Sequence, residues 1–233
     1  MYYREDLARI HHEGFGGYAD SCAPGLLDLL EPNVDVLEIG CGSGALTKHL
    51  LAPGHAVLAT DASEAMVELA ETTVPQAEIL QLTLPNDDIP PSSAIVSVGH
   101  AVNYLASADE IQRAISALAN ALEPDGLLVL DICDLTYGDT RQGVNHASVE
   151  GDGWSMAVTT IFEPPARFVR GMTTTTALED GSTRQDHETH INVLVDVNAV
   201  AESLRNEGFD VCIGRSLGDY TLPDGMYVLT VRN

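Results

Sequence analysis

A glycine-rich turn is the first feature of the sequence that has the residue types of a binding site. The segment VLEIGCGSG occupies residues 36–44, and its apolar start leads directly into Gly40, Gly42 and Gly44. Glycines at such a turn allow tight backbone conformations and let a ligand approach the main chain closely. A helix expected to begin at about residue 45 would direct its free N–H groups at a polar or anionic part of that ligand.

Two carboxylates flank this turn and narrow its chemistry. Glu38 precedes Gly40 by two residues, at the buried end of the first expected strand, and Asp61 follows Gly40 by 21 positions, at the end of the second. A carboxylate at the end of the second strand, where Asp61 lies, reaches the ribose hydroxyls of a nucleoside. Glu38 suits a ligand with a positive amino-acid end and would repel a pyrophosphate. The spacing Gly40-x-Gly42-x-x-Ala45 also fits the loose dinucleotide pattern, so an NAD-dependent oxidoreductase is an alternative.

The elements that must position these residues alternate along the first two thirds of the chain. Apolar runs that predict strands lie at residues 34–39, 56–60, 77–81, 94–98 and 126–132. Helical stretches separate them, and two of these helices have expected N-caps at Ser63 and Ser107. This alternation predicts an α/β, Rossmann-like sheet of seven mostly parallel strands, with helices on both faces.

The pattern changes after the fifth expected strand. Segments rich in Thr and Gly at residues 154–162, 168–177 and 189–195 predict an antiparallel β-insertion. Asp196 is expected to cap a further helix that ends at Gly208. The last two strands are expected at residues 211–213 and 226–231.

Several of these motifs carry a family resemblance. The run E-x-G-x-G-x-G at residues 38–44 resembles motif I of class I S-adenosylmethionine-dependent methyltransferases. The stretches GFGGYA (14–19), SVGHAVNYL (97–105) and GDYTLPDG (218–225) resemble a small-molecule subset of that family with a β-insertion after the fifth strand. The resemblance implies S-adenosylmethionine as cofactor, S-adenosylhomocysteine as product, and transfer of a methyl group to N, O or C of a small-molecule acceptor by in-line displacement. A cofactor-binding protein without turnover is a further alternative.

The resemblance also assigns residues to the cofactor. It implies that the methionine part is held by Glu38, Gly40, Cys41, Gly42 and Gly44, and the ribose by Asp61. The residues placed near the adenine are Ala62 and Met66, and those near the sulfonium are Tyr18, Gly99 and His100. The aspartate that the family usually has after the third strand is absent. The expected substitutes are the backbone groups of Leu82, Thr83 and Leu84, or the Thr83 hydroxyl.

Length and the change in sequence pattern predict a single domain of residues 1–233 with four parts. They are N-terminal cap helices (1–33), a cofactor-binding core (34–135), the β-insertion over the acceptor site (136–195), and a C-terminal helix with the last two strands (196–233).

Six residues are candidates for catalysis or for contact with the acceptor. His100 is either a general base or a wall residue beside the cofactor, and Asn103 either steadies the loop or contacts the acceptor. Tyr104 is expected to pack in the core rather than contact substrate. Glu188 and His190 share one strand face, which is either a solvated face, the favoured interpretation, or a wall of the acceptor pocket. Arg170 is expected in a surface ion pair, with binding of an acceptor carboxylate as the alternative.

Composition limits the partners. The 233 residues include 35 acidic and 11 basic side chains, a formal net charge of -24, which disfavours nucleic acid and anionic membranes. No apolar run approaches the roughly 20 residues needed to span a bilayer. Residues 1–13 are polar and charged and lack the apolar region of a signal peptide, so a cytoplasmic protein is expected. The four cysteines are scattered without a CxxC pair, which indicates reduced thiols. His187 and His190 point to opposite strand faces, so no metal site is expected. A monomer or a homodimer is expected.

Overall fold

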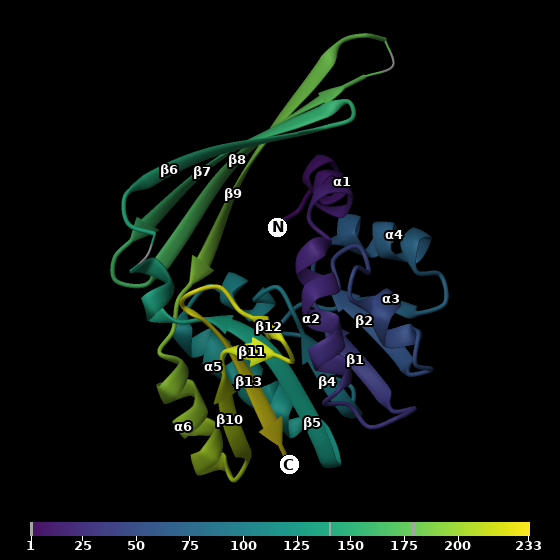
Figure 1. Cartoon of the computed structure of the whole chain (residues 1–233), viewed down its shortest axis with the longest axis vertical. Coiled ribbons are helices and arrows are strands. Elements are labelled where there is room, and N and C mark those ends of the chain that lie inside the picture. The colour runs from purple at the N-terminus through teal and green to yellow at the C-terminus, as the bar shows by residue number, and fades with distance from the viewer. Residues whose placement is uncertain (1, 140, 179) are drawn as a thin grey trace.

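The computed structural model describes residues 2–139, 141–178 and 180–233, and its body is a seven-stranded sheet between helices (Figure 1). The spatial order of the strands is β10–β13–β5–β4–β1–β2–β3. Their bounds are β1 Asp35–Ile39, β2 Ala56–Asp61, β3 Glu78–Gln81, β4 Ser92–Ser97, β5 Leu122–Cys133, β10 Asp210–Gly214 and β13 Met226–Arg232.

Six of the seven strands of this sheet run in the same direction, and β13 alone runs opposite to them. Strands β3, β2, β1, β4 and β5 pair in parallel, whereas β13 runs antiparallel to both β5 and β10. Parallel neighbours require crossover connections, which the intervening helices and loops provide. The predicted seven-stranded, mostly parallel sheet is confirmed.

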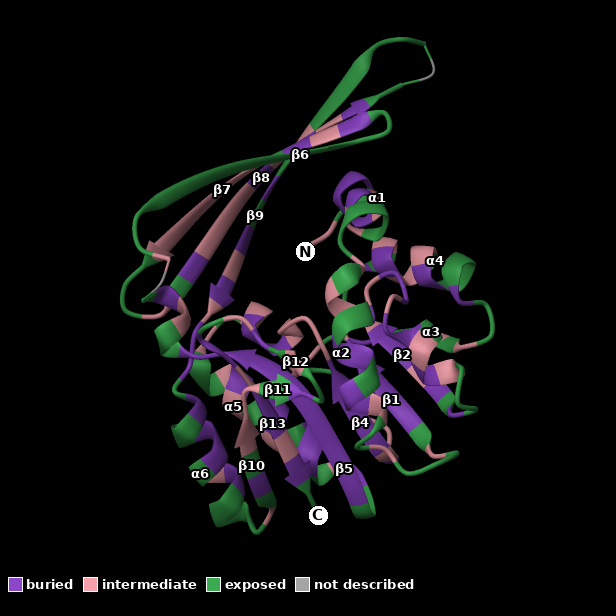
Figure 2. Cartoon of the chain, in the orientation of Figure 1, coloured by how far each residue is buried: buried purple, intermediate pink, exposed green. Residues whose placement is uncertain are grey.

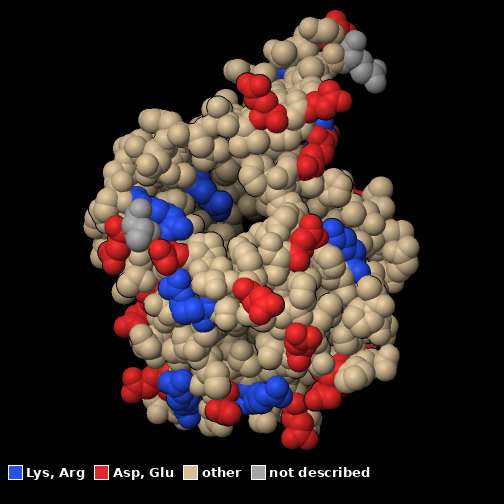
Figure 3. Space-filling model, viewed as in Figure 1, with Lys and Arg blue, Asp and Glu red and all other residues tan. Residues whose placement is uncertain are grey.

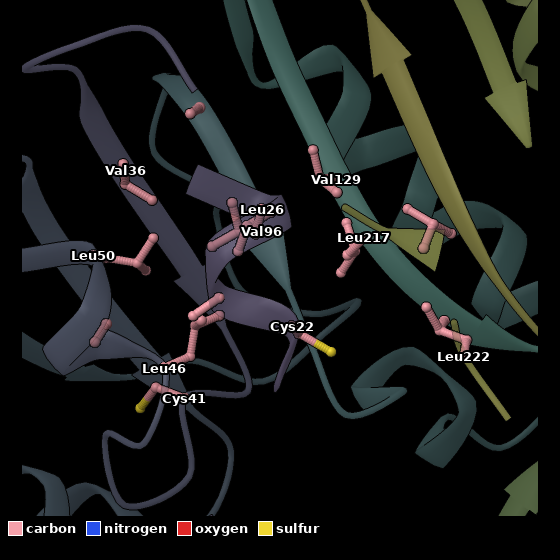
Figure 4. Packing of buried hydrophobic residues seen from close by; sticks show 14 of the residues in the cluster. Cys22, Leu26, Val36, Cys41, Leu46, Leu50, Val96, Val129, Leu217 and Leu222 are labelled. Carbon is pink, nitrogen blue, oxygen red and sulfur yellow. The ribbon is translucent and has the colours of Figure 1, made fainter. Parts of the chain in front are cut away.

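Helices cover both faces, as the sequence predicts, and each face has its own hydrophobic core (Figure 2). The helices are α1 Glu5–Gly14, α2 Gly17–Leu27, α3 Thr47–Leu51, α4 Glu64–Thr73, α5 Ala108–Asn120 and α6 Val197–Glu207. Val36 of β1 packs on the α2 side with Cys22 and Leu26 (Figure 4), whereas its neighbour Leu37 packs on the α5 side with Ile115. Successive residues alternate because a central parallel strand is buried on both faces.

Helix termini follow the polar residues expected at them. Ser63 and Ser107 accept hydrogen bonds from Met66 N–H and Glu110 N–H, and Asp196 accepts two from the first turn of α6. Gly208 ends α6 in the left-handed conformation, at φ 107°. The expected start of α3 at residue 45 is wrong by two residues, because the positive φ of Gly44 keeps residues 43–46 in turns.

A second sheet of four antiparallel strands rises from the carboxyl edge of the first and overhangs it (Figure 1). Its strands are β6 Val144–Gly151, β7 Trp154–Glu163, β8 Arg167–Ala177 and β9 Thr183–Val193. We call this unit the overhanging sheet. Strand β6 was not expected, because every one of its residues is exposed and only pairing with β7 defines it. Strand β9 begins six residues before the expected start at residue 189.

Short elements complete the chain. The 3₁₀ turn η1 Ala101–Tyr104 follows β4, and η2 Leu135–Gly138 follows β5. A small hairpin of β11 Ser216–Leu217 and β12 Tyr220–Thr221, also not expected, lies against α2. Helix α1 contacts the overhanging sheet, where Trp154 Nε1 donates to the Glu13 carboxylate at 2.5 Å.

The structure bears on two features of the composition, the apolar segments and the cysteines. No helix in the described ranges is both long and apolar enough to span a bilayer. The cysteines are free thiols, and Cys22, Cys41 and Cys133 are buried, whereas Cys212 is exposed.

Candidate active site

The carboxyl ends of β1, β2, β4 and β5 meet at one edge of the main sheet, under the overhanging sheet. The residues expected to hold the cofactor leave the strands at this edge, as ligand-binding residues do in open α/β sheets. The glycine turn follows β1 and Asp61 ends β2, whereas Gly99 and His100 follow β4.

Glycine is required in the turn for both conformation and space. Gly40 and Gly44 have φ values of 73° and 86°, in the region that side chains disfavour. A Cβ at Gly40 would lie 2.6 Å from the Cβ of Ala101, and one at Gly44 would lie 2.6 Å from Val74 Cγ2. The turn therefore brings bare backbone to the sheet edge, closed in from behind by neighbouring side chains.

Glu38 places a buried carboxylate beneath this turn. Its side chain is 1% exposed and accepts a hydrogen bond from the Thr47 hydroxyl at 2.7 Å. Burial raises the pKa of Glu38 to about 7, against the opposing effect of the Thr47 hydrogen bond. A carboxylate so placed lacks a cation among the described residues, and a ligand ammonium would supply one.

Asp61 is fixed by the turn itself. Its Oδ2 accepts from Gly42 N–H at 2.9 Å and its Oδ1 accepts from Ser63 N–H at 2.8 Å. Burial raises its pKa, while these two backbone hydrogen bonds lower it. Each oxygen has a further lone pair, so the carboxylate has acceptor capacity for two hydroxyls of a ligand. Cys41 is not available in the same way, because its N–H donates to Thr60 O and its thiol is buried.

The residues expected near an adenine differ in their accessibility. Ala62 is exposed, whereas Met66 is buried below Gly42, and Leu82 is buried too. The backbone groups expected to replace the missing aspartate are partly used: Leu82 N–H donates to Asp61 O, and Thr83 N–H donates to Asp87 at 2.7 Å. Of the expected substitutes, the exposed Thr83 side chain and half-buried Leu84 therefore stay accessible.

Asp131 is a central residue that sequence reasoning missed. It lies in β5, is 1% exposed, and accepts three hydrogen bonds: from Gly99 N–H at 3.0 Å, His100 N–H at 2.6 Å and the Tyr18 hydroxyl at 2.5 Å. Its signal in the sequence is a single acid inside the apolar strand GLLVLDI. The carboxylate joins α2, β4 and β5 and holds the loop after β4 at the site.

His100 lies on that loop in a left-handed conformation, at φ 50°. Burial, with a further contribution from Arg170, lowers its pKa to about 3, so its imidazole is neutral near pH 7. Its Nδ1 is buried and has no hydrogen-bond partner among the described residues, and its ring stacks on Tyr104 at 6.1 Å between centroids. A base with so low a pKa takes up a proton weakly, which favours the wall role.

The residues expected on the acceptor side form one cluster, except for Asn103. Asn103 is fully buried, and its amide bonds to the backbone of Cys133 and Val193, which is the loop-steadying arrangement. Tyr104 is only half-buried, and its ring contacts His100 and His190.

The favoured interpretation of Glu188 and His190 as a solvated face is wrong. Both are buried, at 7% and 0% exposure, and His190 Nε2 lies 3.0 Å from Glu188 Oε2. Tyr2 and Tyr3 of the N-terminal segment pack on the His190 ring, each at 4.7 Å between centroids. This segment covers the strand face, a contact that no feature of the sequence indicated beyond the presence of two adjacent tyrosines.

The surface ion pair expected for Arg170 is also wrong. Its guanidinium bonds to the Tyr104 hydroxyl and, at 3.2 Å, to Asn192 Oδ1. No carboxylate in the described part of the chain lies within ion-pair distance. Figure 3 shows a hollow between the overhanging sheet and the body, with basic side chains on its wall. His187 is exposed, and no cluster suited to a metal occurs among the described residues.

Comparison with known proteins identifies the core of the chain. Residues 36–126, which hold the glycine turn, Asp61 and His100, match a family described as a methyltransferase domain. The match ends within β5 and does not include the overhanging sheet. The resemblance to class I S-adenosylmethionine-dependent methyltransferases is confirmed. No comparison supports the dinucleotide alternative.

Curated relatives match part of the chain. An uncharacterized methyltransferase of Oceanobacillus iheyensis is 35% identical over 124 residues, which are 49% of this chain and 51% of the relative. The dTDP-3-amino-3,4,6-trideoxy-alpha-D-glucopyranose N,N-dimethyltransferase of Streptomyces venezuelae is 26% identical over 151 residues, 58% of this chain and 64% of that protein. The chain thus spans between about two fifths and two thirds of the curated relatives it matches.

Solved methyltransferase structures share the fold over nearly the whole chain. An S-adenosylmethionine-dependent methyltransferase from Clostridium acetobutylicum has a TM-score of 0.80 at 16% identity, with 97% of each chain covered. The sugar N-methyltransferase KedS8 from Streptoalloteichus has a TM-score of 0.79 at 20% identity, covering 98% of this chain and 94% of its own. The overhanging sheet therefore belongs to the shared fold.

Proposed function

We propose that the protein is an S-adenosylmethionine-dependent methyltransferase acting on a small-molecule acceptor. One observation carries the proposal: the buried Glu38 carboxylate, the bare backbone of the glycine turn and the fixed Asp61 carboxylate converge on one sheet edge. Their charges and spacing fit the ammonium, the chain and the ribose of an amino-acid nucleoside, with S-adenosylhomocysteine as the product.

In this proposal the cofactor supplies an electrophilic methyl group on a sulfonium. Glu38 binds the ammonium and Asp61 accepts hydrogen bonds from the ribose hydroxyls. Asp131 acts as a positioning residue, because it holds Gly99 and His100 at the wall where the methyl group would face the acceptor. The protein mainly has to align the acceptor and exclude water.

We assign the acceptor site to the hollow below the overhanging sheet, on the side of Tyr104 and Arg170. Two similar proteins, a sugar N-methyltransferase and a deoxyaminosugar N,N-dimethyltransferase, support nitrogen among the three candidate acceptor atoms. His100 serves as a wall residue in this scheme, and an acceptor amine loses its proton to solvent before transfer. The proposal also keeps the division of the chain into cap helices, cofactor-binding core, β-insertion over the acceptor site and C-terminal part.

A cytoplasmic location and a monomeric or homodimeric state stay predictions. The three buried free thiols are compatible with a reducing compartment. Light scattering of the purified protein measures the oligomeric state directly.

Calorimetry with S-adenosylhomocysteine tests the proposal. The wild type should bind, and Asp61→Asn should bind about 10-fold to 100-fold more weakly, because it loses charge-assisted hydrogen bonds to the ribose. Asp88→Asn is the matched control, since Asp88 is exposed and forms no hydrogen bond or ion pair among the described residues. Turnover against a panel of amines, hydroxyls and carboxylic acids then separates an enzyme from a protein that only binds the cofactor. No binding by the wild type would overturn the proposal.

A further inference from the structure

Arg170 is a cation on strand β8 of the overhanging sheet, without a partner of opposite charge among the described residues. In the described part of the chain, its Nη2 donates to the Tyr104 hydroxyl and to Asn192 Oδ1, which are dipoles rather than carboxylates. Its Nε is buried and has no hydrogen-bond partner there. The guanidinium therefore retains donor capacity in a place that water reaches poorly.

More than half of the basic side chains of this very acidic protein have a carboxylate partner. With 35 acidic residues available, six of the 11 basic side chains form ion pairs. They are Arg4, Arg9, Lys48, Arg167, Arg184 and Arg215. A charge removed from water is costly unless it is paired. The one arginine held under the overhanging sheet by Tyr104 and Asn192 is thus left for an anion that the described chain does not itself supply.

Aromatic and polar side chains surround Arg170. Tyr104 lies between Arg170 and His100: the guanidinium is 5.6 Å from the Tyr104 ring, which stacks on the His100 ring. Across the strand pair, Arg170 is in register with His190. Buried nitrogen atoms of His190 and Asn192 also have no hydrogen-bond partner among the described residues. These groups add polar contacts around the guanidinium.

We propose that Arg170 binds an oxyanion of the acceptor, a carboxylate or a phosphate, and so sets its orientation toward His100. The inference rests on the proposed function, because the acceptor site is assigned to the same hollow. The guanidinium fork matches the two oxygens of either anion. The acceptor then spans the Tyr104 ring, with its anionic group at Arg170 and its methyl-accepting atom on the His100 side.

The test uses three probes of similar shape on the full chain saturated with S-adenosylhomocysteine. They are benzoate, phenyl phosphate and the uncharged benzamide, and their affinities are measured by calorimetry at constant ionic strength. Benzoate or phenyl phosphate should bind at least about 10-fold more tightly than benzamide. Arg170→Gln should remove this preference, and Arg170→Lys should keep part of it. Arg113→Gln, which changes an exposed arginine of α5, is the control and should behave as wild type.

The outcomes separate this inference from the proposed function. A preference for benzoate identifies a carboxylate acceptor, and a preference for phenyl phosphate identifies a phosphate ester. Equal binding of all three probes to the wild type, or an unchanged preference in Arg170→Gln, overturns the inference even if S-adenosylhomocysteine binds normally. Failure of S-adenosylhomocysteine to bind the wild type instead refutes the proposed function. Cofactor affinity and thermal unfolding of each variant report whether it is folded.

Discussion

The burial of Glu38 gives cofactor binding a defined pH dependence. Burial raises the pKa of this carboxyl to about 7; the Thr47 hydrogen bond acts against that shift, and Asp61 adds to it. An ammonium group bound at Glu38 requires the ionised form. The free protein must therefore lose a proton from Glu38 whenever S-adenosylhomocysteine binds below pH 7.

The size of the effect follows from that pKa. With a value near 7, about nine tenths of the free protein has an ionised Glu38 at pH 8, but only about one tenth at pH 6. Affinity should therefore fall about tenfold over this interval, which is about 1.4 kcal/mol. Near pH 7, binding should release about half a proton.

Calorimetry at pH 6, 7 and 8, in buffers of different ionisation enthalpy, measures both the affinity and the proton release. Glu38→Gln should bind weakly at every pH and show no proton release from this site. Asp88→Asn, with its exposed side chain, should keep the wild-type slope. Affinity that does not change between pH 6 and 8, or a proton release that persists in Glu38→Gln, would refute the role assigned to Glu38.

The same shift predicts the stability of the ligand-free protein. The folded-state pKa of Glu38 is raised above its ordinary value of 4.5, so folding disfavours the ionised form. Stability from this group is therefore greatest below pH 4.5 and is lost as the pH rises toward 7. Glu38→Gln should make the ligand-free protein more stable at pH 8, by up to about 3 kcal/mol in urea unfolding, and should give no such gain near pH 4.

Two further predictions concern positioning and packing. Asp131→Asn cannot accept from both Gly99 and His100, so it should cost about 1–3 kcal/mol in urea unfolding and weaken S-adenosylhomocysteine binding; unchanged stability and affinity would contradict the positioning role. Gly25→Ala would place a Cβ 2.0 Å from the backbone of Leu217 and should cost about 3 kcal/mol or more, whereas Gly17→Ala in the same helix meets no atom within 4 Å and should cost little. Equal melting temperatures for these two variants would show that α2 does not pack closely on the β11–β12 hairpin.

Local signals in the sequence were sufficient for the main sheet and for the cofactor half of the site. Apolar runs located its strands, and Ser63, Ser107 and Asp196 marked helix starts, because a cap acts within a few residues of itself. The glycine turn and Asp61 could be paired in advance, since consecutive parallel strands end at the same edge of a sheet. These features depend on neighbours along the chain or on the next strand.

The acceptor half depended on contacts between distant segments. Alternation correctly put Glu188 and His190 on one face of a strand, but a period of two does not say whether that face meets solvent or protein. Tyr2 and Tyr3, nearly 190 positions away, decide that it is buried. The exposed strand β6 had no apolar pattern to reveal it.

Arg170 and Asp131 show the physical reason most clearly. In the sequence, Arg170 is an arginine on a polar strand, and Asp131 is an acid within an apolar strand. Asp131 holds the loop after β4 only when β4, β5 and α2 meet. Arg170 is a half-buried cation without an ion-pair partner among the described residues only once the overhanging sheet has formed. The sequence alone determined the sheet and the glycine turn that we propose bind the cofactor. Burial and the resulting charge environment, which depend on the whole tertiary structure, decided which residues lie at the proposed acceptor site.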